Sequence, residues 1–230
     1  MSTIVTTTFG PVQGVVKDDV LLFSGIPYAA APTGPLRFQA AQPHAGWEEV
    51  RSASRFGKAA PQLATGSMTA AVPVPWSEDC LFLNITTPAA DDQKRPVFFW
   101  IHGGGYRTGQ GAVPWYNGAQ FAKQGDIVTV SINYRMGALG FTDLSRFGPQ
   151  YATSGVNGIL DQITALEWVR DNIAAFGGDP SQVTIGGESA GAFAVSTLLG
   201  SPRAQGLFQR AIAQSGAAQH TLTTEAGGIV

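Results

Sequence analysis

Val183-Thr184-Ile185-Gly186-Gly187-Glu188-Ser189-Ala190-Gly191 is the run of residues from which the architecture of this chain can be inferred. It ends in the pentapeptide G-x-S-x-G, and the apolar residues before the pentapeptide predict a buried strand. The small-residue segment 190–199 follows and predicts a helix. A tight turn between a strand and a helix needs glycine-sized residues, and it holds the Ser189 hydroxyl exposed on a strained backbone. The bare pattern also fits an ordinary Gly-rich turn, but the flanking strand and helix favour a nucleophilic serine.

A second glycine-rich element follows another predicted strand. The apolar run 96–101 has the character of a strand buried on both faces, and His102-Gly103-Gly104-Gly105 comes directly after it. Attack of a serine on a carbonyl builds negative charge on the carbonyl oxygen, so the site needs backbone N–H donors aimed at that oxygen. Glycines let the chain approach closely enough to supply them. We expect Gly104, Gly105 and Ala190 to be the donors.

The triple glycine has two other interpretations, a flexible loop and a phosphate cradle. A Walker loop needs G-x-x-x-x-G-K-[ST] and a dinucleotide-binding fold needs G-x-G-x-x-G, and the chain contains neither pattern. Because each glycine element follows its own predicted strand, the pair indicates acyl transfer by a serine.

The rest of the chain alternates between predicted strands and helices. Apolar residues at spacings of three and four predict a helix over 159–176, and a short helix is expected over 119–124. Further strands are predicted over 78–85, 126–132 and 211–214. This alternation indicates an α/β fold, a mostly parallel sheet with helices on both faces. Residues 4–23 indicate an antiparallel meander at one sheet edge, whereas 39–78 and 133–153 are expected to be irregular.

Composition excludes several classes of protein. The 230 residues carry a net charge of −2 and no run of basic residues, so nothing indicates a nucleic-acid partner. The single cysteine, Cys80, cannot form an internal disulfide, and we expect it to be a small buried hydrophobe. No secretory leader and no run of membrane-spanning length is seen, so we expect a cytoplasmic protein. A processed secreted form would look the same. No linker or repeat divides residues 1–230, which we expect to belong to one domain.

The general base is the missing part of the chemistry. When a serine nucleophile follows a strand in this way, the acid and then the histidine are expected after it. No Asp or Glu lies between Ser189 and His220, and Glu225 comes after that histidine, in the wrong order. We expect His102 to shape the glycine loop by hydrogen bonding and His44 to lie at the surface.

Two other residues are candidates for a supporting role. Glu188 could tune the site or contact a cationic group of the substrate, although a buried, hydrogen-bonded structural role is favoured. Ser215, after the last predicted strand, is either a hydrogen-bonding residue behind the nucleophile or an ordinary turn residue. The scattered His and Cys residues offer no metal-ligand spacing, and no cofactor is implied.

The motifs occur in an order that resembles the type-B carboxylesterase family, and within it the bacterial para-nitrobenzyl esterases. The resemblance implies an α/β-hydrolase fold, a serine esterase with Ser189 as the acyl-accepting nucleophile, and an oxyanion hole of Gly104, Gly105 and Ala190. The matching stretches are Gly25–Ala29, Leu36–Phe38, Glu78–Asn84, Trp100–Gly105, Asn133–Arg135, Phe176–Pro180 and Gly186–Ala192.

Two features depart from that family. Many members pair the cysteine equivalent to Cys80 with an upstream cysteine, which this chain lacks. Family enzymes are also considerably longer, and their acid and histidine lie in a C-terminal half. We therefore expect an N-terminal fragment that is nearly inactive alone, with an unpaired edge at strand 211–214, uncovered apolar faces, and a complementing C-terminal segment as a partner. The substrate would be a small carboxylic ester. The alternatives are a non-catalytic esterase-like interaction module and a related acyltransferase or thioesterase.

Overall fold

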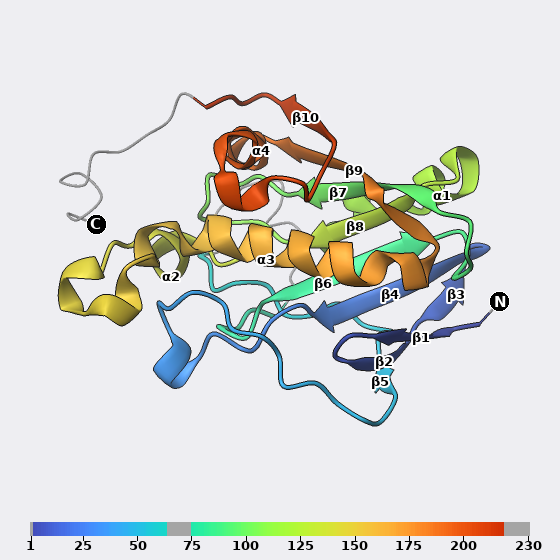
Figure 1. Ribbon diagram of the computed structural model, residues 1–230, viewed down its shortest axis with the longest axis horizontal. Coiled ribbons are helices and arrows are strands. Elements are labelled where there is room, and N and C mark those ends of the chain that lie inside the picture. Colours follow the sequence, from blue (N-terminus) through green and yellow to red (C-terminus); the bar gives the residue numbers. More distant parts are fainter. Residues whose placement is uncertain (1, 64–74, 219–230) are drawn as a thin grey trace.

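A seven-stranded sheet forms the centre of the computed structural model, which describes residues 2–63 and 75–218 (Figure 1). Its strands, in spatial order, are β10 (Arg210–Gln214), β9 (Gly178–Glu188), β7 (Arg95–Ile101), β8 (Val128–Ile132), β6 (Phe82–Thr87), β4 (Val20–Pro27) and β3 (Val15–Lys17). A smaller sheet beside the N-terminus contains β1 (Ile4–Thr7), β2 (Gly10–Gln13) and β5 (Arg51–Ser52).

The large sheet is mixed. The strands β10, β9, β7 and β8 run parallel to one another, whereas β6 is antiparallel to β8, β4 to β6 and β3 to β4. The strands β7, β8 and β9 contribute buried apolar side chains to the core, as the sequence of β7 predicted. This arrangement is an α/β-hydrolase fold, so the predicted fold class is confirmed.

The N-terminal meander is divided between the two sheets. Strands β3 and β4 join the large sheet, but β1 and β2 pair with each other and with β5 instead. The division falls at Gly14, between β2 and β3. A Cβ there would lie 2.5 Å from the carbonyl oxygen of Leu22, so only glycine lets the chain pass this close to β4.

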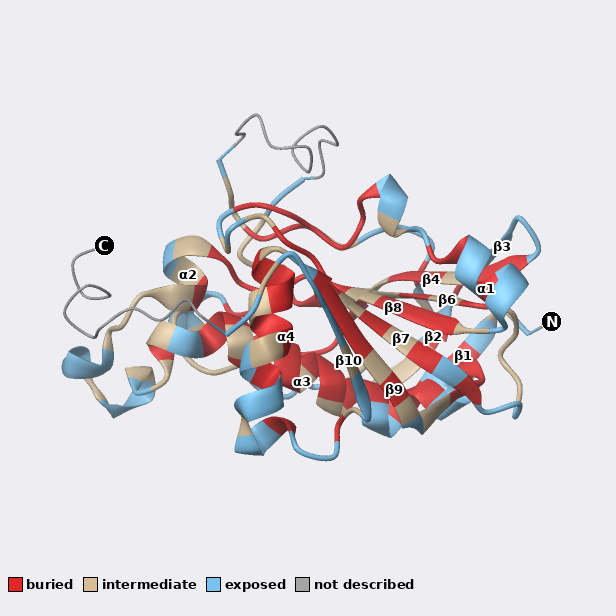
Figure 2. Cartoon of the chain, turned by 90° about the horizontal axis from the view of Figure 1, so that it is seen from above, coloured by how far each residue is buried: buried red, intermediate tan, exposed pale blue. Residues whose placement is uncertain are grey.

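Helices lie on both faces of the large sheet, as the sequence predicted. The short helix α1 (Ala119–Gly125) packs against β4, β6 and β8, whereas α3 (Asn157–Asn172) and α4 (Ala190–Gly200) cover the opposite face (Figures 1 and 2). The apolar face predicted for α3 is buried from Ile163 onward. The helix continues as a 3₁₀ turn, Ile173–Phe176, and ends at Gly177, whose φ of 80° suits glycine.

Some predicted boundaries were wrong. The strand expected over 78–85 begins only at Phe82, and Glu78 instead forms an ion pair with Arg37. The segment 133–153, expected to be irregular, contains helix α2 (Gly137–Phe141) and two 3₁₀ turns. These short elements have too few residues to show a helical period in the sequence.

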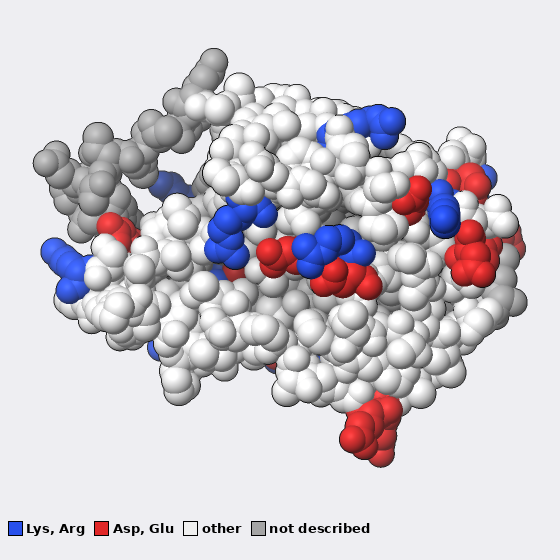
Figure 3. Space-filling view, viewed as in Figure 1, with Lys and Arg blue, Asp and Glu red and all other residues white. Residues whose placement is uncertain are grey.

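The strand at the C-terminal edge is exposed. Among the described residues β10 pairs only with β9, and Ile212 at its centre is 46 % exposed (Figure 2). This agrees with the unpaired edge expected from the sequence. Charged residues are scattered over the face shown in Figure 3, with both signs interspersed. Within residues 2–63 and 75–218, no helix has the length and apolar character needed to cross a membrane.

Candidate active site

The sheet brings the two glycine-rich elements together. Strands β7 and β9 are parallel neighbours, and Ile101 at the end of β7 lies level with Gly187 near the end of β9. The residues that follow each strand therefore meet at the same end of the sheet, beyond the carboxyl ends of β7 and β9. A Cβ built on Gly103 would lie 3.2 Å from Cβ of Ser189 and 2.6 Å from the backbone oxygen of Glu188. Only glycine fits at position 103, and the glycine loop lies against the serine turn.

Ser189 occupies a strained turn between β9 and α4. Its φ of 54° and ψ of −120° lie in a region that non-glycine residues rarely adopt. The glycines on either side of it make the turn possible, because a Cβ on Gly187 would lie 2.5 Å from the backbone of Gly191. A Cβ on Gly191 would lie 2.1 Å from the carbonyl oxygen of Ile101. The need for glycine-sized residues on both sides of the turn is as predicted, and the structure adds that Gly191 packs against the end of β7.

Hydrogen bonds orient the peptides of the glycine loop. The imidazole Nδ1–H of His102 donates to the carbonyl oxygen of Gly103 at 2.9 Å, and the amides of Arg107 and Thr108 donate to the carbonyl oxygen of Gly104 at 3.0 Å each. Because a trans peptide is planar, its N–H points away from its own C=O. Holding these two carbonyls therefore directs the N–H groups of Gly104 and Gly105 the other way. The hydrogen bonding predicted for His102 in this loop is confirmed.

The peptide after Ser189 is fixed in the same way. The carbonyl oxygen of Ser189 accepts hydrogen bonds from the amides of Ala192 and Phe193, at 2.9 and 3.0 Å. This orients the N–H of Ala190, the first residue of α4. The N-terminus of a helix carries partial positive charge, so an anion beside this amide is stabilised. The amide of Ser189 itself donates to the carbonyl oxygen of Gln214, which joins the turn to β10.

His102 lies in a buried setting that suits anchoring and not proton transfer. Its side chain is 1 % exposed, and its ring stacks on Tyr134 with 4.5 Å between ring centroids. Burial lowers the pKa of His102 to about 4, although the hydrogen bond with Gly103 acts in the opposite direction. The imidazole is therefore neutral near pH 7. Its Nε2 atom has no hydrogen-bond partner among the described residues.

The other predicted site residues occupy different settings. Glu188 is exposed, so the favoured expectation of a buried, hydrogen-bonded glutamate is wrong; its Oε2 would lie 2.9 Å from a Cβ built on Gly103. Ser215 is also exposed, directly after β10, with a left-handed φ of 57°. His44 is half-buried between Phe9 and Trp47. His220 and Glu225 lie outside the described residues.

Tyr134 is a site residue for which sequence analysis predicted no role. It belongs to the stretch Asn133–Arg135, which contributed only to the family resemblance. Its hydroxyl donates to the carbonyl oxygen of His102 at 2.8 Å, and its side chain is fully buried. No local sequence pattern predicts this contact, because it joins residues 32 positions apart.

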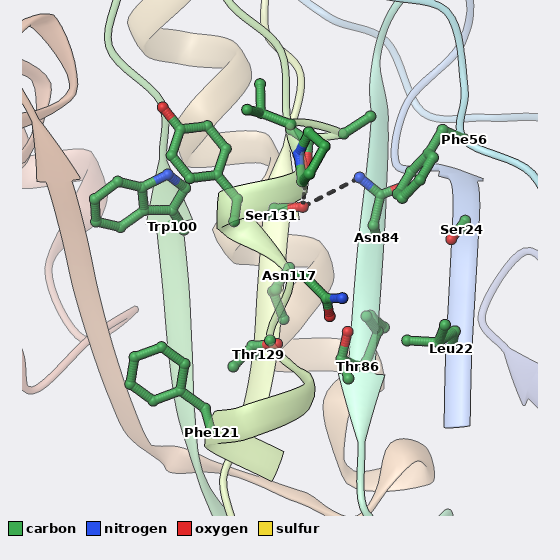
Figure 4. A pocket seen from close by; sticks show the side chains of 18 of the residues that line it. Leu22, Ser24, Phe56, Asn84, Thr86, Trp100, Asn117, Phe121, Thr129 and Ser131 are labelled. Carbon is green, nitrogen blue, oxygen red and sulfur yellow. Dashed lines mark hydrogen bonds between the residues drawn. The ribbon is translucent and has the colours of Figure 1, made fainter. Parts of the chain in front are cut away.

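A cavity of about 580 Å³ lies on the sheet face beside α1 (Figure 4). Its walls include Phe98 and Trp100 of β7, Phe121 of α1, and the hydrogen-bonded pair Asn84 and Ser131. Neither Ser189 nor the glycines of the loop line it. The cavity therefore does not include the serine turn or the glycine loop.

Comparison with known proteins identifies relatives over nearly the whole chain. The model of the family described as "Carboxylesterase family" matches residues 1–227. The para-nitrobenzyl esterase of Bacillus subtilis is 45 % identical over 96 % of this chain and 45 % of its own length. A solved structure of PNB esterase superposes with a TM-score of 0.94 at 44 % identity, and covers 100 % of this chain and 47 % of that one. A Geobacillus stearothermophilus carboxylesterase structure gives 0.88 at 51 % identity, over 94 % of this chain and 44 % of that one. The chain thus spans less than half the length of these relatives.

Proposed function

The chain belongs to the carboxylesterase family, and from this premise we propose that it carries the nucleophile and the oxyanion hole of a carboxylic-ester hydrolase. The observation that carries the proposal is the register of β7 and β9, which places Ile101 opposite Gly187 and so sets the glycine loop beside Ser189. A nucleophile on a strained turn and oriented amides next to it are the two parts that acyl transfer requires.

Each residue has a definite task in this mechanism. The Ser189 oxygen attacks the ester carbonyl and forms a tetrahedral intermediate, whose oxyanion accepts hydrogen bonds from the N–H groups of Gly104, Gly105 and Ala190. The intermediate collapses, the C–O bond to the alcohol breaks, and the alcohol leaves with a proton. Water then attacks the acyl-enzyme and releases the carboxylic acid. The substrate is a small carboxylic ester.

A general base must accept the serine proton, and His102 is unsuited to that task. Its Nδ1–H is committed to Gly103, and its pKa near 4 makes it a weak base at neutral pH. We propose that the base and its acidic partner come from polypeptide beyond this sequence, as in a Ser-His-acid triad. The chain alone would then retain only the slow turnover that an oxyanion hole supports.

The same additional polypeptide accounts for the exposed sheet surfaces. Strand β10 lacks a second neighbour among the described residues, and aromatic side chains that include Trp100 and Phe121 line the cavity beside α1 (Figure 4). Phe121 at its rim is 53 % exposed. Each relative has more than half its length outside the matched region. We propose that such a complementing segment covers this face and continues the sheet from β10.

The test is ester hydrolysis by the full-length gene product. Wild type should hydrolyse p-nitrophenyl acetate, and Ser189→Ala should reduce kcat by about 10⁵- to 10⁶-fold. Ser201→Ala, a serine at the far end of α4, is the matched control and should leave kcat unchanged. An inactive wild type that carries an acid and a histidine after Ser189 would contradict the proposal and favour a non-catalytic interaction module. Transfer of the acyl group to an acceptor other than water would instead identify an acyltransferase.

A further inference from the structure

The Gln62 side chain holds the backbone of Gly109 at two points. Its Oε1 accepts the N–H of Gly109 and its Nε2 donates to the carbonyl oxygen of Gly109, both at 2.9 Å. A primary amide that pairs with both backbone groups of one residue fixes the position and the orientation of that residue. The Gln62 amide therefore clamps the chain 47 residues further on, in the segment that follows the glycine loop.

Gly109 in turn supports the hydrogen bond that orients Gly104. Its φ is 120°, and a Cβ there would lie 2.4 Å from Nδ1 of His102 and 2.5 Å from the carbonyl oxygen of Gly103. The backbone of Gly109 therefore packs directly on the pair of atoms that fixes the Gly103–Gly104 peptide. If Gly109 moved away, that peptide would have room to rotate.

The segment that carries Gln62 is itself anchored. Its Nε2 also donates to the carbonyl oxygen of Ala60 at 3.1 Å, and Ala59 and Ala60 are both buried. The amide of Ala59 donates to Pro75, whereas its carbonyl accepts from Ser77. The clamp thus joins the segment 59–62 to the segment that follows the glycine loop.

We propose that Gln62 is a positioning residue for the oxyanion hole, acting through Gly109 on the direction of the Gly104 N–H. The expected effect of Gln62 on catalysis rests on the proposed function. The expected effect of Gln62 on the position of the loop backbone does not depend on activity. The hydrogen bonds of the Gln62 side chain go to the backbone of Gly109 and Ala60, so its proposed effect on the donors passes through the backbone.

Two variants of Gln62 and one control distinguish the effect of the Gln62–Gly109 hydrogen bonds from the effect of the local Gln62–Ala60 bond. Gln62→Ala removes both contacts with Gly109, and Gln62→Glu places a carboxylate oxygen against the carbonyl of Gly109, where no donor remains. Gln42→Ala is the matched control. The Nε2 of Gln42 donates to the carbonyl two residues earlier, Ala40, at 3.0 Å, which repeats the Gln62–Ala60 bond without a clamp.

The first measurement is hydrolysis of p-nitrophenyl acetate by the full-length gene product, with kcat normalised to the sites that a fluorophosphonate titrates. Loss of one oxyanion donor costs about a hundred- to a thousandfold, so partial misdirection of Gly104 should lower kcat by about tenfold in both Gln62 variants. KM should change less than twofold, and the affinity for a trifluoromethyl ketone should fall in parallel with kcat. Gln42→Ala should match wild type. Normalisation removes any contribution from unfolded protein.

The second measurement is amide hydrogen exchange over residues 102–109. Exchange there should be at least about tenfold faster in Gln62→Ala than in wild type or Gln42→Ala. If the wild type fails to hydrolyse esters, the proposed function fails while the exchange result still decides the inference. Equal exchange in Gln62→Ala and Gln42→Ala would overturn it, as would equal kcat values in an active enzyme.

Discussion

The Tyr134 hydroxyl donates to the carbonyl oxygen of His102 while its ring stacks on the same histidine's imidazole, at 2.8 Å and 4.5 Å respectively. Burial raises the pKa of Tyr134, so the hydroxyl keeps its proton and remains a donor. One side chain thus fixes both the backbone and the ring of the residue that opens the glycine loop. The loop owes its shape to contacts from outside itself as well as to its glycines.

Tyr134→Phe should lower kcat by about three- to tenfold with little change in KM, because the stack survives and the hydrogen bond to His102 is lost. The free energy of unfolding should fall by about 1 kcal/mol. Tyr28→Phe is the control, since the Tyr28 hydroxyl makes an equivalent buried bond to the carbonyl of Asn133 at 2.7 Å. It should lose similar stability and keep kcat. Equal kcat values in the two variants would show that the Tyr134 bond does not orient the loop.

Gly191→Ala should destabilise the fold by at least about 3 kcal/mol, because its Cβ would lie 2.1 Å from the backbone oxygen of Ile101. Gly200→Ala, in the same helix, meets no atom within 4 Å and should be neutral or slightly stabilising. Urea unfolding of the full-length product measures both changes. A Gly191 variant as stable as the Gly200 variant would mean that the turn is not packed against β7.

Ser189→Gly should be more stable than Ser189→Ala by about 1–3 kcal/mol, since glycine adopts a φ of 54° without strain. At Ser201, whose φ is −86°, the order should reverse, with the alanine variant the more stable. Thermal unfolding of the four variants tests this. Glycine and alanine of equal stability at 189 would argue against a strained nucleophile.

The buried His102 predicts a dependence of stability on pH. The unfolded chain protonates His102 near pH 6.5 and the folded chain only near pH 4, so between these values the unfolded state binds more protons. The free energy of unfolding should therefore fall as the pH drops from about 6.5 to about 4, by about 3 kcal/mol from this residue.

His102→Asn provides the measurement, since an amide can still donate to the carbonyl of Gly103 but cannot titrate. Its free energy of unfolding, measured by urea titration at several pH values, should lack that share of the decline. His44→Asn, at a half-buried histidine whose pKa burial also lowers, should keep most of it. An unchanged pH profile in His102→Asn would contradict the neutral, buried imidazole.

Local pattern predicted much of this molecule. The buried strands β7 and β9, the helix α3 and the turn at Ser189 follow from runs and spacings of a few residues, and the glycines at 187 and 191 predicted the close approach that the structure shows. The buried state of Cys80 was also confirmed. These features depend on neighbours in sequence, which a single chain displays.

Features that depend on contacts between residues far apart in the sequence could not be predicted from local patterns. The roles of Tyr134 and Gln62 arise from contacts with residues 32 and 47 positions away. Glu188 was placed wrongly because which way a residue faces at a strand's end depends on the turn after it. The single domain over 1–230, the cytoplasmic location and the role of Ser215 stay predictions.

The most direct measurement is covalent labelling of the full-length gene product by a fluorophosphonate, with the labelled residue located by peptide mass spectrometry. The reagent forms a phosphonyl ester with an activated serine and loses fluoride, so it reports the nucleophile and its base together. One label per molecule, on Ser189, is the predicted result, and Ser189→Ala should take up none. A label on another serine, or an unlabelled wild type that contains the complete triad, would contradict the assignment of Ser189 as the nucleophile of an esterase.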